Sequence, residues 1–217
     1  GIIKPERPVF VGNVEACVAT VFERKAEECN ASLQYASTRE STGEISEDED
    51  SGLPCQYFLA DGNQVALSLL GPVQLENASL VYSVVQYICE EYQLDLARAL
   101  KGFSLVSWPA RFQILSDGTV VDGAHNADGA RVLVQSLSSC FPAEKFTFVF
   151  GNFADKDSQE ILSIVEPVAE SFIFVPILSG RESCKVEDLQ AMIGVDNGVA
   201  ADVVEGVTMA RTMGRRV

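Results

Sequence analysis

Apolar residues in the first half of the chain follow two patterns. Short apolar runs are typical of buried strands, and apolar residues that recur every three or four positions are typical of amphipathic helices. The pair Asp61-Gly62 lies between two such runs and indicates a β-hairpin. The pattern predicts strands over residues 8–11, 32–38, 56–60 and 64–70, and helices over residues 14–29, 76–92 and 95–100.

Each of the two longer predicted helices has one apolar face. The face of the first consists of Val14, Val18, Val21, Phe22 and Cys29. The face of the second consists of Ala78, Val81, Val85, Ile88, Cys89 and Tyr92. We expect both faces to point to the core, because surface helices of globular proteins turn their apolar side inward.

The second half of the chain alternates between strands and helices. The runs 146–150 and 172–176 are almost wholly apolar, as expected for parallel strands covered on both faces. The pattern predicts strands over residues 112–115, 119–122, 146–150 and 172–176, and helices over residues 128–141, 158–165, 186–193 and about 207–216. Alternation of this kind indicates an α/β domain of the Rossmann type. Residues 102–109 read as a linker, so we expect one domain over residues 1–107 and another over residues 108–217.

The chain is acidic: 31 Asp and Glu residues outnumber 16 Lys and Arg residues, and the net charge is −15 with the single His neutral. Phosphate contacts need clustered basic side chains, so nucleic acid is a poor candidate partner. No apolar run approaches the ~20 residues of a membrane helix. The first residues form neither a signal peptide nor a transit sequence. We expect a cytoplasmic, monomeric protein that binds neither nucleic acid nor membrane.

Two sequence features argue against a bound metal within this chain. The acidic run 40–52 lacks the spaced ligands of a calcium loop, and we predict a solvated, mobile loop there. The chain has one His and no CxxC pair, which leaves no recognisable zinc site. We therefore predict no metal ligands in this chain.

The densest group of candidate functional residues lies at 120–129, where a predicted strand ends and a helix begins. Ligands of open α/β sheets bind at the carboxyl ends of strands, where Asp122 would project. Asn126 is a plausible N-cap, and the amide groups behind it could receive an anion. His125, the single imidazole, belongs to the same turn. The alternative is a capped turn with a structurally bonded His.

Two further segments carry polar side chains at element boundaries. Arg111 follows Trp108 and Pro109, and a guanidinium suits a phosphate well. The alternative for this segment is a packing anchor at a domain junction. Gln74 and Asn77 lie between a strand and a helix, where their amides could read a base edge or a ribose. The alternative is simple helix capping.

Several common catalytic motifs are absent from the sequence. No Gly-Lys dipeptide occurs, so no P-loop is present to hold a triphosphate. The sequence also lacks GxGxxG after a strand, GxSxG and HExxH. A standard nicotinamide site, an α/β-hydrolase nucleophile and a zinc protease site are therefore unsupported.

Five segments, in this order, carry a resemblance to a known family. Residues 1–5 are GIIKP, 74–78 QLENA, 108–112 WPARF, 122–130 DGAHNADGA and 151–157 GNFADKD. They resemble the EKAGIIKP, HQxxNA, WPGRF, DGAHNPDGA and G…DKD motifs of the folylpolyglutamate synthase / dihydrofolate synthase family of Mur-type ligases. Of these, the DGAHN segment is the most specific.

The resemblance implies a fold and a reaction. It implies the C-terminal part of a Mur-type central ATPase domain followed by a Rossmann-like α/β C-terminal ligase domain. Family members use ATP, with Mg²⁺, to phosphorylate a folate or dihydropteroate carboxylate, which the amine of L-glutamate then attacks. By the same resemblance, Asn77 contacts adenine, Arg111 the phosphates and Asp122 the ribose or its neighbourhood. His125 is near the incoming glutamate.

Two departures from the family pattern concern the nucleotide contacts. Val73 stands where the family usually has His, and Ala110 where it has Gly. The family's P-loop and Mg²⁺ ligands precede the matched segments, so we expect this chain to have no ligase activity by itself. Two alternatives remain: a non-catalytic module that binds a nucleotide or a protein partner, and a cell-wall Mur ligase.

Overall fold

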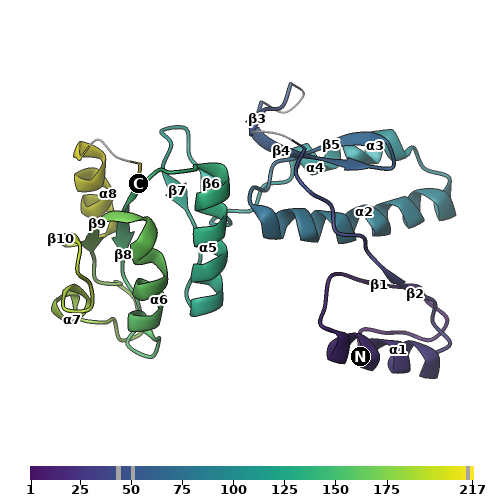
Figure 1. Cartoon of the computed structure of the whole chain (residues 1–217), viewed down its shortest axis with the longest axis horizontal. Coiled ribbons are helices and arrows are strands. Elements are labelled where there is room, and N and C mark those ends of the chain that lie inside the picture. The colour runs from purple at the N-terminus through teal and green to yellow at the C-terminus, as the bar shows by residue number, and fades with distance from the viewer. Residues whose placement is uncertain (43–44, 50–51, 214–215) are drawn as a thin grey trace. The chain divides into compact units, whose positions relative to one another are not determined.

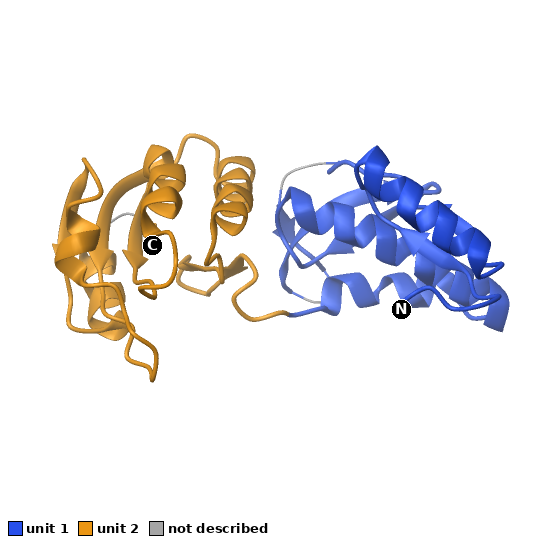
Figure 2. Ribbon diagram, turned by 90° about the horizontal axis from the view of Figure 1, so that it is seen from below, with its two compact units in different colours: residues 1–107 blue, residues 108–217 orange. Residues whose placement is uncertain are grey.

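The computed structural model describes residues 1–42, 45–49, 52–213 and 216–217. The chain forms two compact units, Gly1–Ser107 and Trp108–Val217, drawn in blue and orange in Figure 2. Residues 43–44 and 50–51 of the predicted acidic loop, and residues 214–215 of the last predicted helix, lie outside the described residues.

The first unit contains two small sheets and four helices among its described residues (Figure 1). Strands β1 (Val9–Val11) and β2 (Leu33–Tyr35) pair in parallel, with helix α1 (Ala16–Glu28) between them in sequence. Strands β3 (Ser46–Glu47), β4 (Pro54–Ala60) and β5 (Asn63–Leu67) form an antiparallel sheet. Helices α2 (Pro72–Tyr92), α3 (Leu96–Leu100) and α4 (Gly102–Leu105) follow.

The predicted hairpin is confirmed, and its turn explains why. Asp61 and Gly62 both have positive φ, 50° and 81°, as the tight turns that match the strand twist require. The hairpin of β4 and β5 packs against α2, where Tyr82 is fully buried and donates a hydrogen bond to the carbonyl oxygen of Ala60 at 3.3 Å. The rings of Tyr82 and Phe58 meet edge to face with centroids 6.5 Å apart. This contact forms the centre of the unit's core.

The predicted apolar face of α1 is wrong as a core face, whereas about half of the predicted face of α2, including Ala78 and Val85, is confirmed. On α1, Val18 is 40% and Val21 is 52% exposed, and Ala26 is the buried residue. A two-stranded sheet of three-residue strands is too small to cover that face. On α2, Ala78 and Cys89 are buried, but Val81, Ile88 and Tyr92 are exposed. The side of α2 that meets the hairpin instead carries Leu75, Ala78, Ser79 and Tyr82.

Two predicted boundaries in this unit are also wrong. Helix α2 begins at Pro72, four residues before the predicted start, because proline is favourable in the first turn of a helix. Residues 102–105 of the predicted linker form α4. Phe103 anchors that helix: its ring is 7% exposed, and its carbonyl oxygen accepts the backbone N–H of Ser68 at 3.1 Å.

The second unit is a mixed α/β structure built around a parallel sheet. Strands β8 (Phe146–Phe150), β9 (Ala169–Phe174) and β10 (Asp196–Val199) pair in parallel in the order β10-β9-β8. The predicted strands near residues 112 and 119 form the separate antiparallel pair β6 (Gln113–Ile114) and β7 (Val120–Val121). The helices are α5 (Ala127–Cys140), α6 (Ser158–Val165), α7 (Val186–Gln190) and α8 (Val203–Thr212), with a 3₁₀ turn at Glu166–Val168.

Successive residues of β9 point to opposite layers of helices, as in a strand covered on both faces. Phe172 and Phe174 pack in one cluster with Leu162 of α6 and Leu189 of α7, and Ile173 packs in another with Ala210 of α8. The strand β10 is missing from the sequence prediction. Its Asp, Asn and Gly residues disfavour strands, and pairing with β9 supplies the strand conformation.

The helix expected at about 207–216 runs instead from Val203 to Thr212. The side chain of Asp202 caps it by accepting the N–H of Glu205 at 2.9 Å. No helix among the described residues has both the length and the apolar character that crossing a membrane would need.

Candidate functional site

The turn between β7 and α5 has the capped geometry that the sequence predicted. The side chain of Asn126 accepts the N–H of Gly129 at 2.8 Å, which confirms it as the N-cap of a 14-residue helix. This bond satisfies one of the free amide groups in the first turn. The residues between β7 and that cap, Asp122 to His125, form the candidate site of the second unit.

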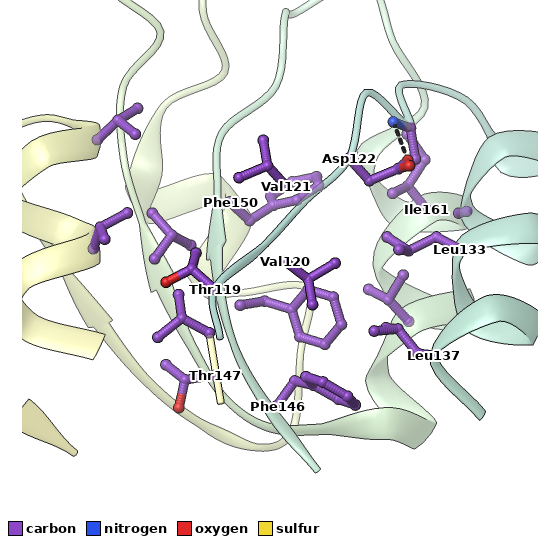
Figure 3. A pocket seen from close by; sticks show the side chains of 18 residues that line it. Thr119, Val120, Val121, Asp122, Leu133, Leu137, Phe146, Thr147, Phe150 and Ile161 are labelled. Carbon is purple, nitrogen blue, oxygen red and sulfur yellow. Dashed lines mark hydrogen bonds between the residues drawn. The ribbon is translucent and has the colours of Figure 1, made fainter. Parts of the chain in front are cut away.

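The Asp122 carboxylate lies at the end of β7, where Figure 3 draws it at the rim of an apolar cavity. One oxygen, Oδ1, accepts the N–H of Ala124 at 2.8 Å, and the other, Oδ2, accepts the N–H of Phe112 at 2.8 Å. Hydrogen bonds to a carboxylate are stronger than those between neutral groups. Asp122 therefore joins its own turn to the loop that precedes β6.

That loop, residues 108–112, has an unusual backbone. Ala110 and Phe112 have positive φ values of 57° and 47°, which residues other than Gly seldom adopt. The carbonyl oxygen of Ala110 accepts the N–H of Gly123 at 2.8 Å, and the Ala110 N–H donates to Oε1 of Gln113 at 3.2 Å. Gln113 was not among the predicted site residues. A single sequence offers no signal for it, because its role depends on a non-repetitive backbone conformation.

Arg111 lies between the two left-handed residues, and its side chain is exposed. Among the described residues, no side-chain hydrogen bond or ion pair holds its guanidinium. Phe112 is 4% exposed, and its ring contacts that of Phe141 with centroids 6.4 Å apart. The backbone of Arg111 is thus fixed on both sides, and its charge is available to an anion.

His125 is exposed on the same turn, and its ring Nδ1 lies 3.0 Å from the carbonyl oxygen of Gly123. A carbonyl oxygen can only accept a hydrogen bond, so Nδ1 carries the proton. The other nitrogen, Nε2, then has its lone pair available in the neutral ring. This geometry suits a proton acceptor.

Asn77 belongs to the first unit, on the second turn of α2. Its Nδ2 donates to Oε1 of Gln74 at 3.2 Å. The amide oxygen of Asn77 and the NH₂ group of Gln74 are then left for a ligand. Both residues line a mostly apolar pocket of about 310 Å³ that also includes Leu69, Val81 and Phe103. The pocket is at the small end of ligand sites.

The cavity in Figure 3 is about 240 Å³ and lies among β7, β8, α5, α6 and α8. Its lining is almost wholly apolar, and Asp122, Thr119 and Thr147 are the polar exceptions. In the described ranges, no three His, Cys, Asp or Glu side chains gather in a way that could hold a metal ion.

Comparisons with known proteins agree with this fold. Residues 110–214 match the family "Mur ligase, glutamate ligase domain". The chain is 27% identical over 183 residues to the folylpolyglutamate synthase of Lacticaseibacillus casei, and the match covers 82% of this chain and 42% of that enzyme.

Two solved structures are similar to the chain over almost its whole length. One is the Mycobacterium tuberculosis folylpolyglutamate synthase complexed with ADP, with a TM-score of 0.72 and 24% identity over 95% of this chain and 47% of that one. The other is the bifunctional enzyme of Yersinia pestis complexed with AMPPNP and a Mn ion. It has a TM-score of 0.68 and 22% identity over 98% of this chain and 48% of that one.

The matched domain places residues 110–214 in the glutamate ligase domain of Mur ligases, and the α/β fold agrees with it. Within that class, the chain is similar in sequence and in fold to folylpolyglutamate synthases, in line with the resemblance carried by the motifs at 108–112 and 122–130. The chain spans less than half the length of the relatives reported above.

Proposed function

We propose that this chain takes part in an ATP-dependent ligase that adds L-glutamate to a folate carboxylate. In that reaction the carboxylate accepts the terminal phosphoryl group of ATP and becomes an acyl phosphate. The amine of glutamate then attacks the acyl carbon, inorganic phosphate leaves, and the nitrogen loses a proton. Family membership and the geometry of residues 108–125 support the proposal.

Each candidate residue has a distinct proposed role. Asn77 contacts the adenine with its amide, and the apolar pocket beside it suits a flat ring. The Arg111 guanidinium binds the phosphates, whose oxygens it matches in geometry and charge. Asp122 lies in the neighbourhood of the ribose. His125 receives the proton from the attacking amine on Nε2.

A divalent cation would neutralise charge on the transferring phosphoryl group. Because the described residues of this chain offer no metal cluster, we assign no ligand here and derive no step through Mg²⁺. The chain also lacks a Gly-Lys dipeptide. Glutamate-dependent ATP turnover by this chain alone is therefore not expected, and binding is the more direct test.

The single observation that carries the proposal is the exposed Arg111, which lies between two left-handed residues that are both hydrogen-bonded to the Asp122 turn. A calorimetric titration of the chain with ADP in the presence of Mg²⁺ tests the proposal. We expect Arg111→Ala to weaken binding by about 10- to 100-fold, the loss of a charged hydrogen bond.

The matched control is Arg131→Ala, which removes an exposed guanidinium that pairs with Asp128 and Glu160. It should leave the affinity for ADP unchanged. Asn77→Ala should weaken ADP binding and reduce the preference for ADP over GDP. Equal losses from Arg111→Ala and Arg131→Ala would show that net charge alone matters, which contradicts the assignment.

A further inference from the structure

The Asp122 carboxylate holds together two segments that are ten residues apart in sequence. Its two oxygens accept different backbone amides, that of Phe112 and that of Ala124, each at 2.8 Å. Figure 3 shows the carboxylate at the end of β7, with a hydrogen bond drawn as a dashed line. A residue that served only as a ligand contact would not need both oxygens for backbone groups.

The loop that Asp122 bonds would not be stable alone. Ala110 and Phe112 both have positive φ, and such conformations persist where the surroundings enforce them. Four contacts enforce them here: the Asp122 carboxylate on the Phe112 N–H, the Gly123 N–H on the carbonyl oxygen of Ala110, the Gln113 side chain on the Ala110 N–H, and the packing of the Phe112 ring. The Gly123 N–H also joins the loop to the turn that carries His125, but the carboxylate is the side chain that bonds backbone groups of both segments.

We propose that Asp122 is a positioning residue that sets the backbone of Arg111, and with it the direction of the guanidinium, by locking the two loops. This inference rests on the proposed function, because it makes Arg111 the group that contacts the phosphates. This positioning role is separate from any direct contact of Asp122 with the ribose. The proposal predicts that loss of the carboxylate weakens nucleotide binding through its effect on Arg111.

The substitution Asp122→Asn tests the proposal with almost no change in shape. An amide has one oxygen, so either the Phe112 N–H or the Ala124 N–H must face an NH₂ group in place of an acceptor. We expect hydrogen exchange at one or both of these amides to accelerate at least about tenfold, as expected on losing a charge-assisted bond. The Cα chemical shifts of Ala110 and Phe112, which report φ, should move away from left-handed values.

A binding experiment connects the backbone to the ligand. In a titration with ADP and Mg²⁺, Asp122→Asn should weaken binding about tenfold or more. Arg111→Ala should then reduce the affinity for ADP much less in the Asp122→Asn variant than in the unchanged chain. The effects of two residues that act through one another are not additive. The control Asp128→Asn removes an equal charge from the first turn of α5, where the side chain is 93% exposed, and should change none of these readouts.

The outcomes separate this inference from the proposed function. If Asp122→Asn weakens ADP binding while the Phe112 and Ala124 amides and the Cα shifts stay unchanged, Asp122 contacts the nucleotide directly and the positioning role is overturned. Fully additive losses from Asp122→Asn and Arg111→Ala would overturn it as well. If the unchanged chain binds no ADP, the proposed function fails. The exchange rates and Cα shifts then still decide whether Asp122 sets the Arg111 backbone.

Discussion

The strained loop before β6 leads to a quantitative prediction for Ala110. Its φ of 57° brings the Cβ close to the backbone, which costs an L-residue about 1–2 kcal/mol and glycine none. Glycine also makes the unfolded chain more flexible, which offsets about 0.4–1 kcal/mol of that gain. Ala110→Gly should therefore raise the free energy of unfolding of the second unit by about 0.5–1 kcal/mol. For a unit of this size, the midpoint of thermal unfolding should rise by about 2–6 °C.

Thermal unfolding followed through the amide signals of the second unit would measure this change. Ala143 has a φ of 64° in the turn after α5, so Ala143→Gly is the matched control and should stabilise by a similar amount. Ala201 is exposed and is not among the positive-φ residues, so Ala201→Gly should destabilise slightly. If Ala110→Gly lowers the midpoint while Ala143→Gly raises it, the reasoning about Ala110 is refuted. The resemblance to the WPGRF motif, with Gly at this position, is consistent with the expected sign.

Two further substitutions test the packing of the chain, and one titration tests a hydrogen bond. Phe103→Ala should lower the free energy of unfolding of the first unit by about 3–5 kcal/mol, because the ring is buried in the core of that unit. Gly151→Ala should cost about 1–3 kcal/mol or more in denaturant unfolding, because the new Cβ would lie 2.5 Å from the carbonyl oxygen of Val175. The Thr119 N–H that bonds Asp117 holds the pKa of this carboxyl below its ordinary value, which an NMR titration of the carboxyl would show. The stability that Asp117 contributes is therefore present above the unfolded-state pKa and is lost as the pH falls through the lower folded-state pKa.

The two substitutions have matched control variants. Leu105 is 63% exposed on α4, so Leu105→Ala should change stability by less than about 0.5 kcal/mol. A Cβ on Gly180 would meet nothing within 4 Å, so Gly180→Ala should be tolerated. Equal effects of Phe103→Ala and Leu105→Ala would contradict the packing of α4. An ordinary pKa for Asp117 would contradict its bond to Thr119.

Much of the second unit could be predicted from the sequence, because its signals are local. The almost wholly apolar run 146–150 forms strand β8 of the parallel sheet, and Asn126 is the N-cap of α5. Both follow from residues that are adjacent or three positions apart. The strand β10 could not be predicted in this way, because its conformation comes from pairing with β9 and not from its own residues.

The first unit shows the limit of periodicity as a guide to burial. A helical stripe states which residues share a side, but it does not state what covers that side. Val18 and Val21 share the apolar side of α1 and are exposed, whereas Phe103, in a segment that resembled a linker, is buried. Burial depends on how much apolar surface a neighbouring element presents, and that is a property of the folded chain.

For the candidate site, the sequence by itself determined which residue types are available and to which family they belong. The Asp, His and Arg of the DGAHN and WPARF segments are evident without coordinates. Only the tertiary structure decided that Asp122 bonds the backbone beside Arg111, and that Ala110 and Phe112 adopt left-handed conformations. The physical reason is that a conformation unfavourable to a residue alone is selected by hydrogen bonds from a segment that folding brings beside it.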